Sequence, residues 1–142
     1  QLLHQADIMA TCAEIVGTQL AADQGEDSFS LLRLLAGHDQ PVREHAVSQS
    51  SRGLIGIRKG PWKLIFGPGS GGWTKGHDDH PAQLYNLDND LGEQHNLYAE
   101  HPDKVAEFTE LMETLLNNGR STPGPNQTND KPFDWRRFLE GS

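Results

Sequence analysis

The run HDDH at residues 77–80 offers the side chains that metal ions prefer. Four adjacent residues are too close in sequence to converge on one ion, because zinc sites draw ligands that are better spread through a fold. We interpret the run as a solvated loop. Asp88, Asn89 and Asp90 resemble part of a calcium loop, but no Glu follows at the spacing that an EF-hand requires. Turn formation by these side chains is the simpler explanation, so the sequence predicts no metal site in this chain.

Cys12 is the single cysteine of the chain and excludes an intrachain disulfide. It occupies an apolar position of a predicted helix, so we expect a packed thiol rather than a reactive one. No nucleophile, base and orienting group can be assembled from local spacing. The sequence therefore predicts no catalytic residue within these 142 residues.

Charge is unevenly distributed along the chain, whose formal net charge is −8. Between Arg43 and Lys75 six basic residues face one acid, Glu44, so this segment carries +5 and the other residues sum to −13. The imbalance suggests an anionic partner, such as a sulfated or phosphorylated substrate. The alternative is that these side chains face solvent or protect a sheet edge. No nucleic-acid-binding module is recognisable in the sequence. The sequence contains no run of about 18 apolar residues, so it predicts no membrane span.

Two short helices are predicted near the N-terminus. The first covers 7–16, with Asp7 as its N-cap and Gly17 as its stop, and the second covers 28–36 and is closed by Gly37. The apolar face of the first helix consists of Ile8, Met9, Cys12, Ile15 and Val16.

Four extended segments predict an antiparallel sheet. Residues 44–48, 52–57 and 61–66 are close enough in sequence for a meander, with a turn at 59–61, and residues 83–87 supply a fourth strand.

A long helix is predicted over 102–118. Pro102 suits its first position, Gly119 its exit, and its apolar residues recur at a spacing of three and four, so it should cover one face of the sheet. The fold class is therefore α+β: a four-stranded antiparallel sheet packed by a C-terminal helix, plus two short N-terminal helices.

Two irregular segments complete the chain. Residues 67–82 form a glycine-rich loop in which Trp73 has no periodic apolar partner. Residues 120–134 carry no core pattern. Four apolar residues are expected to dock the C-terminal tail: Phe133, Trp135, Phe138 and Leu139.

Several segments resemble those of a known family, and the last two below also match it in order and spacing. They are DIMATCAEIVG at 7–17, SFSLLRLLAG at 28–37, IRKGPWKLI at 57–65 and QLYNLDNDLGEQHNL at 83–97. Together they resemble the C-terminal subdomain of the sulfatases, arylsulfatase-like members of the alkaline-phosphatase-like superfamily. Ala10 and Arg33 stand where that pattern has proline. GPGSGGW at 67–73 and NNGRSTPGPNQ at 117–127 resemble bacterial sulfatases that act on polysaccharides.

The resemblance implies that the chain is a fragment of a larger enzyme. The family's N-terminal domain carries Cys-x-Pro-x-Arg, whose cysteine becomes formylglycine, beside a calcium ion. Cys12 is followed by Ala-Glu-Ile-Val, so it is not that nucleophile. Calcium and formylglycine are thus implied for the parent enzyme, and no cofactor for this chain. The implied partners are the missing N-terminal catalytic domain and a sulfated substrate such as a polysaccharide, and the apolar helices predict self-association.

Candidate substrate-binding residues also follow from the resemblance. In relatives, strand ends and loops of this subdomain reach the mouth of the active site. By that analogy His45, Trp73 and His77 contact substrate, since aromatic faces stack on sugar rings and histidine donates to sulfate or hydroxyl groups. For His45, a purely structural histidine is the alternative.

The predicted organisation has three parts. Residues 1–40 link to the catalytic domain, 41–119 form the sheet and helix, and 120–142 form an irregular tail. Two other functions stay open: a piece of a related phosphodiesterase or phosphonate hydrolase, and a stand-alone anion-binding interaction module.

Overall fold

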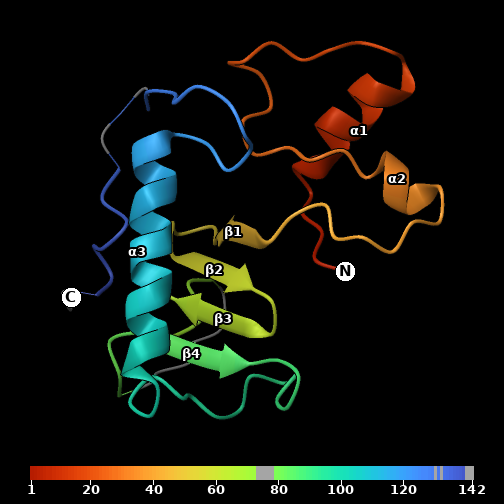
Figure 1. Ribbon diagram of the computed structural model, residues 1–142. Coiled ribbons are helices and arrows are strands. Elements are labelled where there is room, and N and C mark those ends of the chain that lie inside the picture. The colour runs from red at the N-terminus through yellow and green to blue at the C-terminus, as the bar shows by residue number, and fades with distance from the viewer. Residues whose placement is uncertain (73–78, 130, 132, 140–142) are drawn as a thin grey trace. The chain divides into compact units, whose positions relative to one another are not determined.

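The computed structural model describes residues 1–72, 79–129, 131 and 133–139. Within them it contains a four-stranded antiparallel sheet, two short N-terminal helices and a long C-terminal helix (Figure 1). The predicted fold class is confirmed. No helix in this part of the chain is both long and apolar enough to cross a membrane.

The chain divides into two compact units. Unit 1 comprises Gln1–Glu44 and Met112–Lys131, and unit 2 comprises His45–Leu111 and Pro132–Ser142. Each unit is held together by a different kind of interaction.

The sheet forms the centre of unit 2, with strand order β1-β2-β3-β4. Its strands are β1 (His45–Gln49), β2 (Ile55–Lys59), β3 (Trp62–Ile65) and β4 (Gln83–Asn86). Ile57, Leu64 and Leu84 are register partners across β2, β3 and β4, and all three are fully buried. The meander therefore presents one continuous apolar row to the core, as sequence alternation predicts.

The second strand begins later than the predicted residues 52–57. The cause is a turn at its start, where Gly53 adopts a left-handed φ of 87° that disfavours other residues. Ser50 holds this turn, because its backbone N–H donates to the Leu54 carbonyl and its Oγ accepts from the Leu54 N–H at 3.0 Å. The strand then continues through Lys59, which pairs with Trp62, so Lys59 belongs to the strand and not to the predicted turn.

The long helix α3 (Pro102–Asn118) has the predicted bounds and lies across the strands in Figure 1. Within unit 2, Phe108 on its inner face is buried, and Glu107 accepts a hydrogen bond from Lys59 Nζ at 3.0 Å. The Trp62 ring of β3 packs edge-on against His101 just before the helix, with ring centroids 5.1 Å apart. These contacts attach the helix to the sheet.

The C-terminal tail docks through Trp135. Its ring meets Phe66 edge-to-face, with centroids 4.7 Å apart and an interplanar angle of 81°, and it is only 8% exposed. Phe138 lies so close to Gly67 that a Cβ on that glycine would come within 2.7 Å of it. Phe133 is 38% exposed and is therefore much less buried than Trp135. The predicted docking is correct for Trp135 and wrong for Phe133.

Unit 1 contains α1 (Asp7–Ile15) and α2 (Leu32–Leu35). The second helix is much shorter than the predicted 28–36. The reason is that polar groups before it bond to α1: Ser28 Oγ donates to the Ala6 carbonyl and accepts from the Ala10 N–H, while Leu31 N–H donates to Thr11 Oγ1. These bonds hold the preceding segment against α1 in a non-helical conformation.

The burial of α1 is the reverse of what its periodicity predicts. Asp7 and Thr11 are its buried residues, while Ile8 and Val16 are 56% and 73% exposed. Cys12 is also exposed, so the expectation of a packed thiol is wrong. Asp7 is not the N-cap either: Ala6 occupies that position without a side-chain cap. The polar side of α1 faces the protein because Asp7 has a buried partner, Arg43.

Candidate functional site

Of the three predicted substrate-binding residues, the structure describes one. His45 opens β1 in unit 2, where it is partly exposed and lies opposite Lys59 in the strand register. Trp73 and His77 lie outside the described residues. The substrate contacts of these three residues therefore stay predictions from sequence.

The Asp/Asn-rich turn after β4 is a hydrogen-bonded turn. Asp90 Oδ2 accepts from the backbone N–H groups of Gln94 and His95 at 2.7 and 2.8 Å, and Asn86 Oδ1 accepts from the Asp88 N–H. These side chains thus satisfy local backbone donors, as expected for Asx turns. Across the part of the chain that the structure describes, no three His, Cys, Asp or Glu side chains are grouped in a way that could hold a metal ion.

Formylglycine and calcium do not fit the residues present. Cys12 lacks the Pro and Arg of the family motif and lies on an exposed helix face. The most deeply buried acid, Asp7, is committed to Arg43. No step of a sulfatase reaction can therefore be assigned to these side chains.

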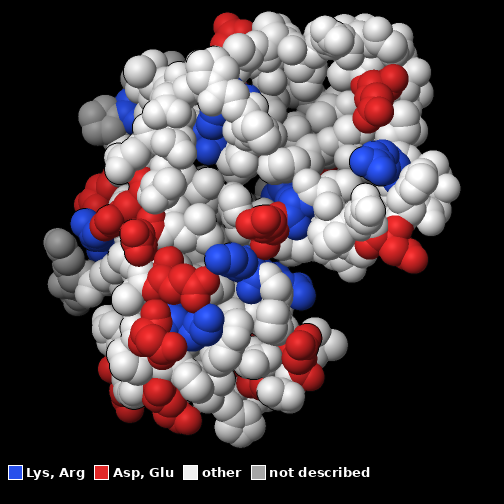
Figure 2. Space-filling model, in the orientation of Figure 1, with Lys and Arg blue, Asp and Glu red and all other residues white. Residues whose placement is uncertain are grey.

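Three of the five described basic residues in the predicted basic segment pair with acids that are distant in sequence. Arg43 pairs with Asp7, Lys59 with Glu107 at 3.0 Å and Lys63 with Glu93 at 2.7 Å. Figure 2 shows acidic side chains interspersed with the basic ones on the face in view, rather than a continuous basic surface.

Glu107 is the acid with the most cationic neighbours in this group. A hydrogen bond from Lys104, followed in size by one from Lys59, lowers the pKa of Glu107 from its ordinary 4.5. The bond with Glu107 in turn raises the pKa of Lys104. These lysines are therefore held in ion pairs at neutral pH and do not form an open anion site.

A pocket in unit 1 was not foreseen from sequence. It has a volume of about 290 Å³, and its lining is formed by Phe29, Ser30, Arg33, His38, Gln40, Pro41 and Val42. Most of these residues come from an irregular segment without periodicity. The one sequence signal was Arg33, which replaces a proline of the family pattern.

The described residues thus contain a pocket and one of the three predicted substrate-binding residues, but no catalytic constellation. No family model matches the chain. It is 38% identical over 120 residues to the N-acetylgalactosamine-6-O-sulfatase of Bacteroides thetaiotaomicron, a match that covers 80% of this chain and 23% of that protein.

Solved structures give the same relationship. One, from work on the metabolism of multiple glycosaminoglycans by Bacteroides thetaiotaomicron, matches with a TM-score of 0.64 and 35% identity, covering 77% of this chain and 24% of that one. A protein solved with its substrate D-glucosamine-2-N,6-O-disulfate matches at TM-score 0.55 and 22% identity, over 76% and 22% of the two chains. Ps i-CgsB, bound to k-i-k-neocarrahexaose, matches at 0.56 and 18%, over 86% and 26%. The last two show the fold alone. The chain spans about a quarter of the length of these proteins.

Proposed function

This chain corresponds to the C-terminal subdomain of a sulfatase, and on that premise we propose that the complete protein containing it hydrolyses sulfuric esters. The observation that carries the proposal is the 38% identity to an N-acetylgalactosamine-6-O-sulfatase over 80% of the chain. The relatives do not favour a phosphodiesterase, a phosphonate hydrolase or a stand-alone anion-binding module.

In this proposal the chain supports the fold and shapes the substrate entrance, and it is inactive alone. Formylglycine and calcium would belong to an N-terminal catalytic domain, because the described residues do not fit either group. The substrate class we infer is a sulfated saccharide, such as a sulfated amino sugar of a polysaccharide. His45, Trp73 and His77 are the proposed contacts to it, and the division at residues 40 and 119 remains part of the proposal.

The exposed apolar face of α1 is the proposed contact surface for the catalytic domain. Ile8, Met9, Ile15 and Val16 are each about half exposed or more. Contiguous apolar surface of this kind marks interaction sites in proteins that would otherwise leave it in water. Without that domain, the same face should lead the chain to associate with itself.

Comparing the isolated chain with the complete protein tests the proposed activity. We expect the complete protein to hydrolyse an aryl sulfate and a 6-sulfated N-acetylgalactosamine, and to lose both activities when its formylglycine cysteine is replaced by alanine. The isolated chain should hydrolyse neither. Turnover by the purified chain that disappears on mutating one of its own residues would contradict the proposal. Hydrolysis of phosphate diesters but not of sulfate esters would establish the phosphoesterase instead.

A further inference from the structure

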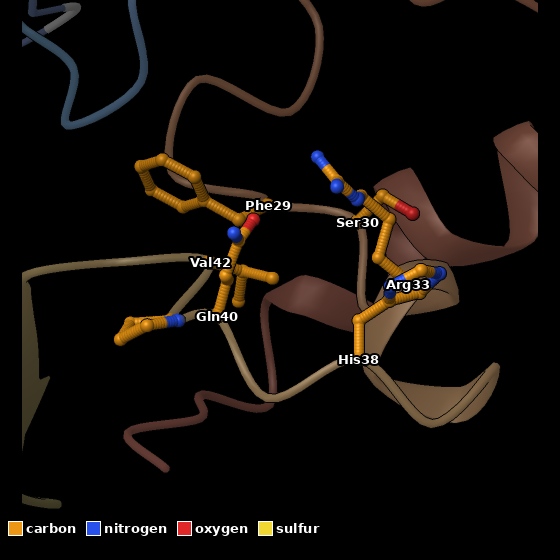
Figure 3. Close-up of a pocket in the computed structure, with 7 residues that line it drawn as sticks. Phe29, Ser30, Arg33, His38, Gln40 and Val42 are labelled. Atoms are coloured by element: carbon orange, nitrogen blue, oxygen red, sulfur yellow. The ribbon is translucent and has the colours of Figure 1, made fainter.

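The pocket in unit 1 is lined by both apolar and polar side chains. Figure 3 shows Phe29, Gln40 and Val42 on one side of the hollow and Ser30, Arg33 and His38 on the other. Phe29 and Ser30 precede α2, Arg33 lies on it, and the remaining lining residues come from the segment between α2 and β1. All seven lining residues belong to unit 1.

Arg33 is the cation of this pocket, and its guanidinium is uncommitted within the described part of the chain. No ion pair or side-chain hydrogen bond joins Arg33 to a described residue, and the same holds for His38 and Gln40. All three side chains are exposed. The contrast is Arg43, which is buried and donates to Asp7 and to the Asp27 carbonyl. Arg43 holds the fold together, whereas Arg33 has its donors available for a ligand.

The lining chemistry selects an anion. None of the lining residues is acidic. A guanidinium presents donors in a planar fork that matches the two oxygens of a carboxylate or sulfate. The Gln40 amide and the His38 ring add further donors.

The size of the pocket limits the ligand. Small-molecule sites are roughly 300–1,000 Å³, and the volume of this pocket, about 290 Å³, is just below that range. One ring with one anionic substituent fits such a volume. Phe29, Pro41 and Val42 offer an apolar surface against which the ring can pack.

We propose that this pocket binds the carboxylate or sulfate group of an acidic monosaccharide unit, with Arg33 as its charge partner and Gln40 and His38 as hydrogen-bond donors. The inference concerns binding alone, so it does not require the complete protein to be a sulfatase.

Calorimetric titration of the complete protein tests the proposal with three probes: sodium glucuronate, sodium galactose 6-sulfate and neutral N-acetylgalactosamine. At least one anion should bind, and Arg33→Leu should weaken that binding by about tenfold, the usual effect of losing one charge-assisted hydrogen bond. Binding of one anion and not the other identifies the source as carboxylate or sulfate. The neutral sugar should not bind in an Arg33-dependent manner.

The matched control is Arg52→Leu, which removes an exposed arginine outside the pocket with the same change in charge. Comparison with this control distinguishes anion binding in the pocket from general electrostatic attraction and from binding at any other anion site. Arg33→Lys keeps the charge without the fork and should bind with intermediate affinity. If Arg33→Leu does not fold, Arg33→Lys or Gln40→Ala can replace it in the same test. Equal affinities for Arg33→Leu and Arg52→Leu, or no anion binding at all, would overturn the proposal. A complete protein that binds the probe but hydrolyses no sulfate ester would instead count against the proposed function and not against this pocket.

Discussion

The guanidinium of Arg43 donates a hydrogen bond to Asp7 Oδ1 at 2.6 Å, and the two side chains are 3% and 0% exposed. Asp7 also accepts from the backbone N–H groups of His4 and Phe29, at 2.8 and 3.0 Å. Arg43 in addition lies over the Phe29 ring, 4.9 Å from its centroid. One buried ion pair therefore joins the start of α1, the segment before α2 and the segment leading to β1.

Breaking this pair should strongly destabilise the chain. We expect Asp7→Ala to lower the free energy of unfolding by about 3–5 kcal/mol, because it leaves the Arg43 charge buried without a carboxylate. Urea denaturation measures the change. The control is Lys63→Ala, which breaks a partly exposed pair with Glu93 and should cost less than about 1 kcal/mol. Similar losses in the two variants would show that the buried pair has no special weight.

The tail contact gives a second prediction for stability. Trp135→Ala removes a nearly buried ring from its packing on Phe66 and should cost about 3 kcal/mol, within the range for large aromatic deletions. Phe133→Ala, in the same tail but more exposed, should change stability by less than about 1 kcal/mol. Thermal unfolding and limited proteolysis of the tail distinguish them, and equal proteolysis of both variants and the parent would contradict docking through Trp135.

Glu107 should give the chain a small acid-sensitive contribution to stability. Its pKa is lower in the folded chain than its ordinary 4.5, mainly through the hydrogen bond from Lys104. A carboxylate with a lowered folded pKa stabilises the fold above its unfolded pKa, and this contribution is lost as the pH falls through the folded pKa. In the Glu107→Gln variant, the free energy of unfolding should therefore fall less steeply as the pH drops below 4.5. Glu107 is exposed to solvent, so its total effect on the free energy of unfolding should stay under about 1 kcal/mol. Unfolding titrations at several pH values measure it, and an unchanged acid slope would rule it out.

Trp73 gives a prediction for the substrate entrance. In the complete protein, Trp73→Ala should reduce kcat/KM on a sulfated polymer by roughly tenfold, equivalent to about 1–2 kcal/mol for one lost stacking contact. Activity on a small aryl sulfate should change little, because that substrate is too short to reach the loop. An equal loss on both substrates would mean that Trp73 supports the fold, and no loss on either would mean that it does not contact substrate.

The apolar face of α1 should make the isolated chain associate. We expect a concentration-dependent increase in mass by light scattering and binding of a hydrophobic dye, both reduced by the double change Ile15→Glu and Val16→Glu. Leu91→Glu is the matched control, since Leu91 is 82% exposed and lies in a turn of unit 2, outside the α1 sequence. A monomeric chain that binds no dye would contradict the assignment of this face as a contact surface.

Sequence patterns predicted the sheet and α3 well because both follow short-range rules. Alternation of apolar residues defined the strands, and Pro102 and Gly119 set the ends of the helix. The same patterns failed at α1, where the deciding contact joins Asp7 to a residue 36 positions away. No periodicity encodes such a pair, so the polar side of the helix was expected in solvent and the apolar side in the core.

The candidate site was less predictable than the fold. His45, Trp73 and His77 came from family resemblance, and the structure describes only His45 among them. The pocket around Arg33 depends on how residues 38–42 turn back toward Phe29. That return follows from tertiary contacts in a segment without apolar repeats, and sequence spacing carries little information about it.

The polar interior of unit 1 has a thermal consequence. Hydration of apolar groups is the main source of the heat-capacity increase on unfolding, and hydration of polar groups lowers it. Unit 1 buries Asp7, Thr11, Ser28 and Arg43, and Met112 is its one buried apolar residue among those that the structure describes. Its unfolding therefore contributes little heat capacity. Cooling weakens an apolar core such as that of the sheet, but it has far less effect on directional bonds between charged and polar groups. We therefore expect cooling toward freezing to weaken the packing of the sheet more than the polar contacts of unit 1.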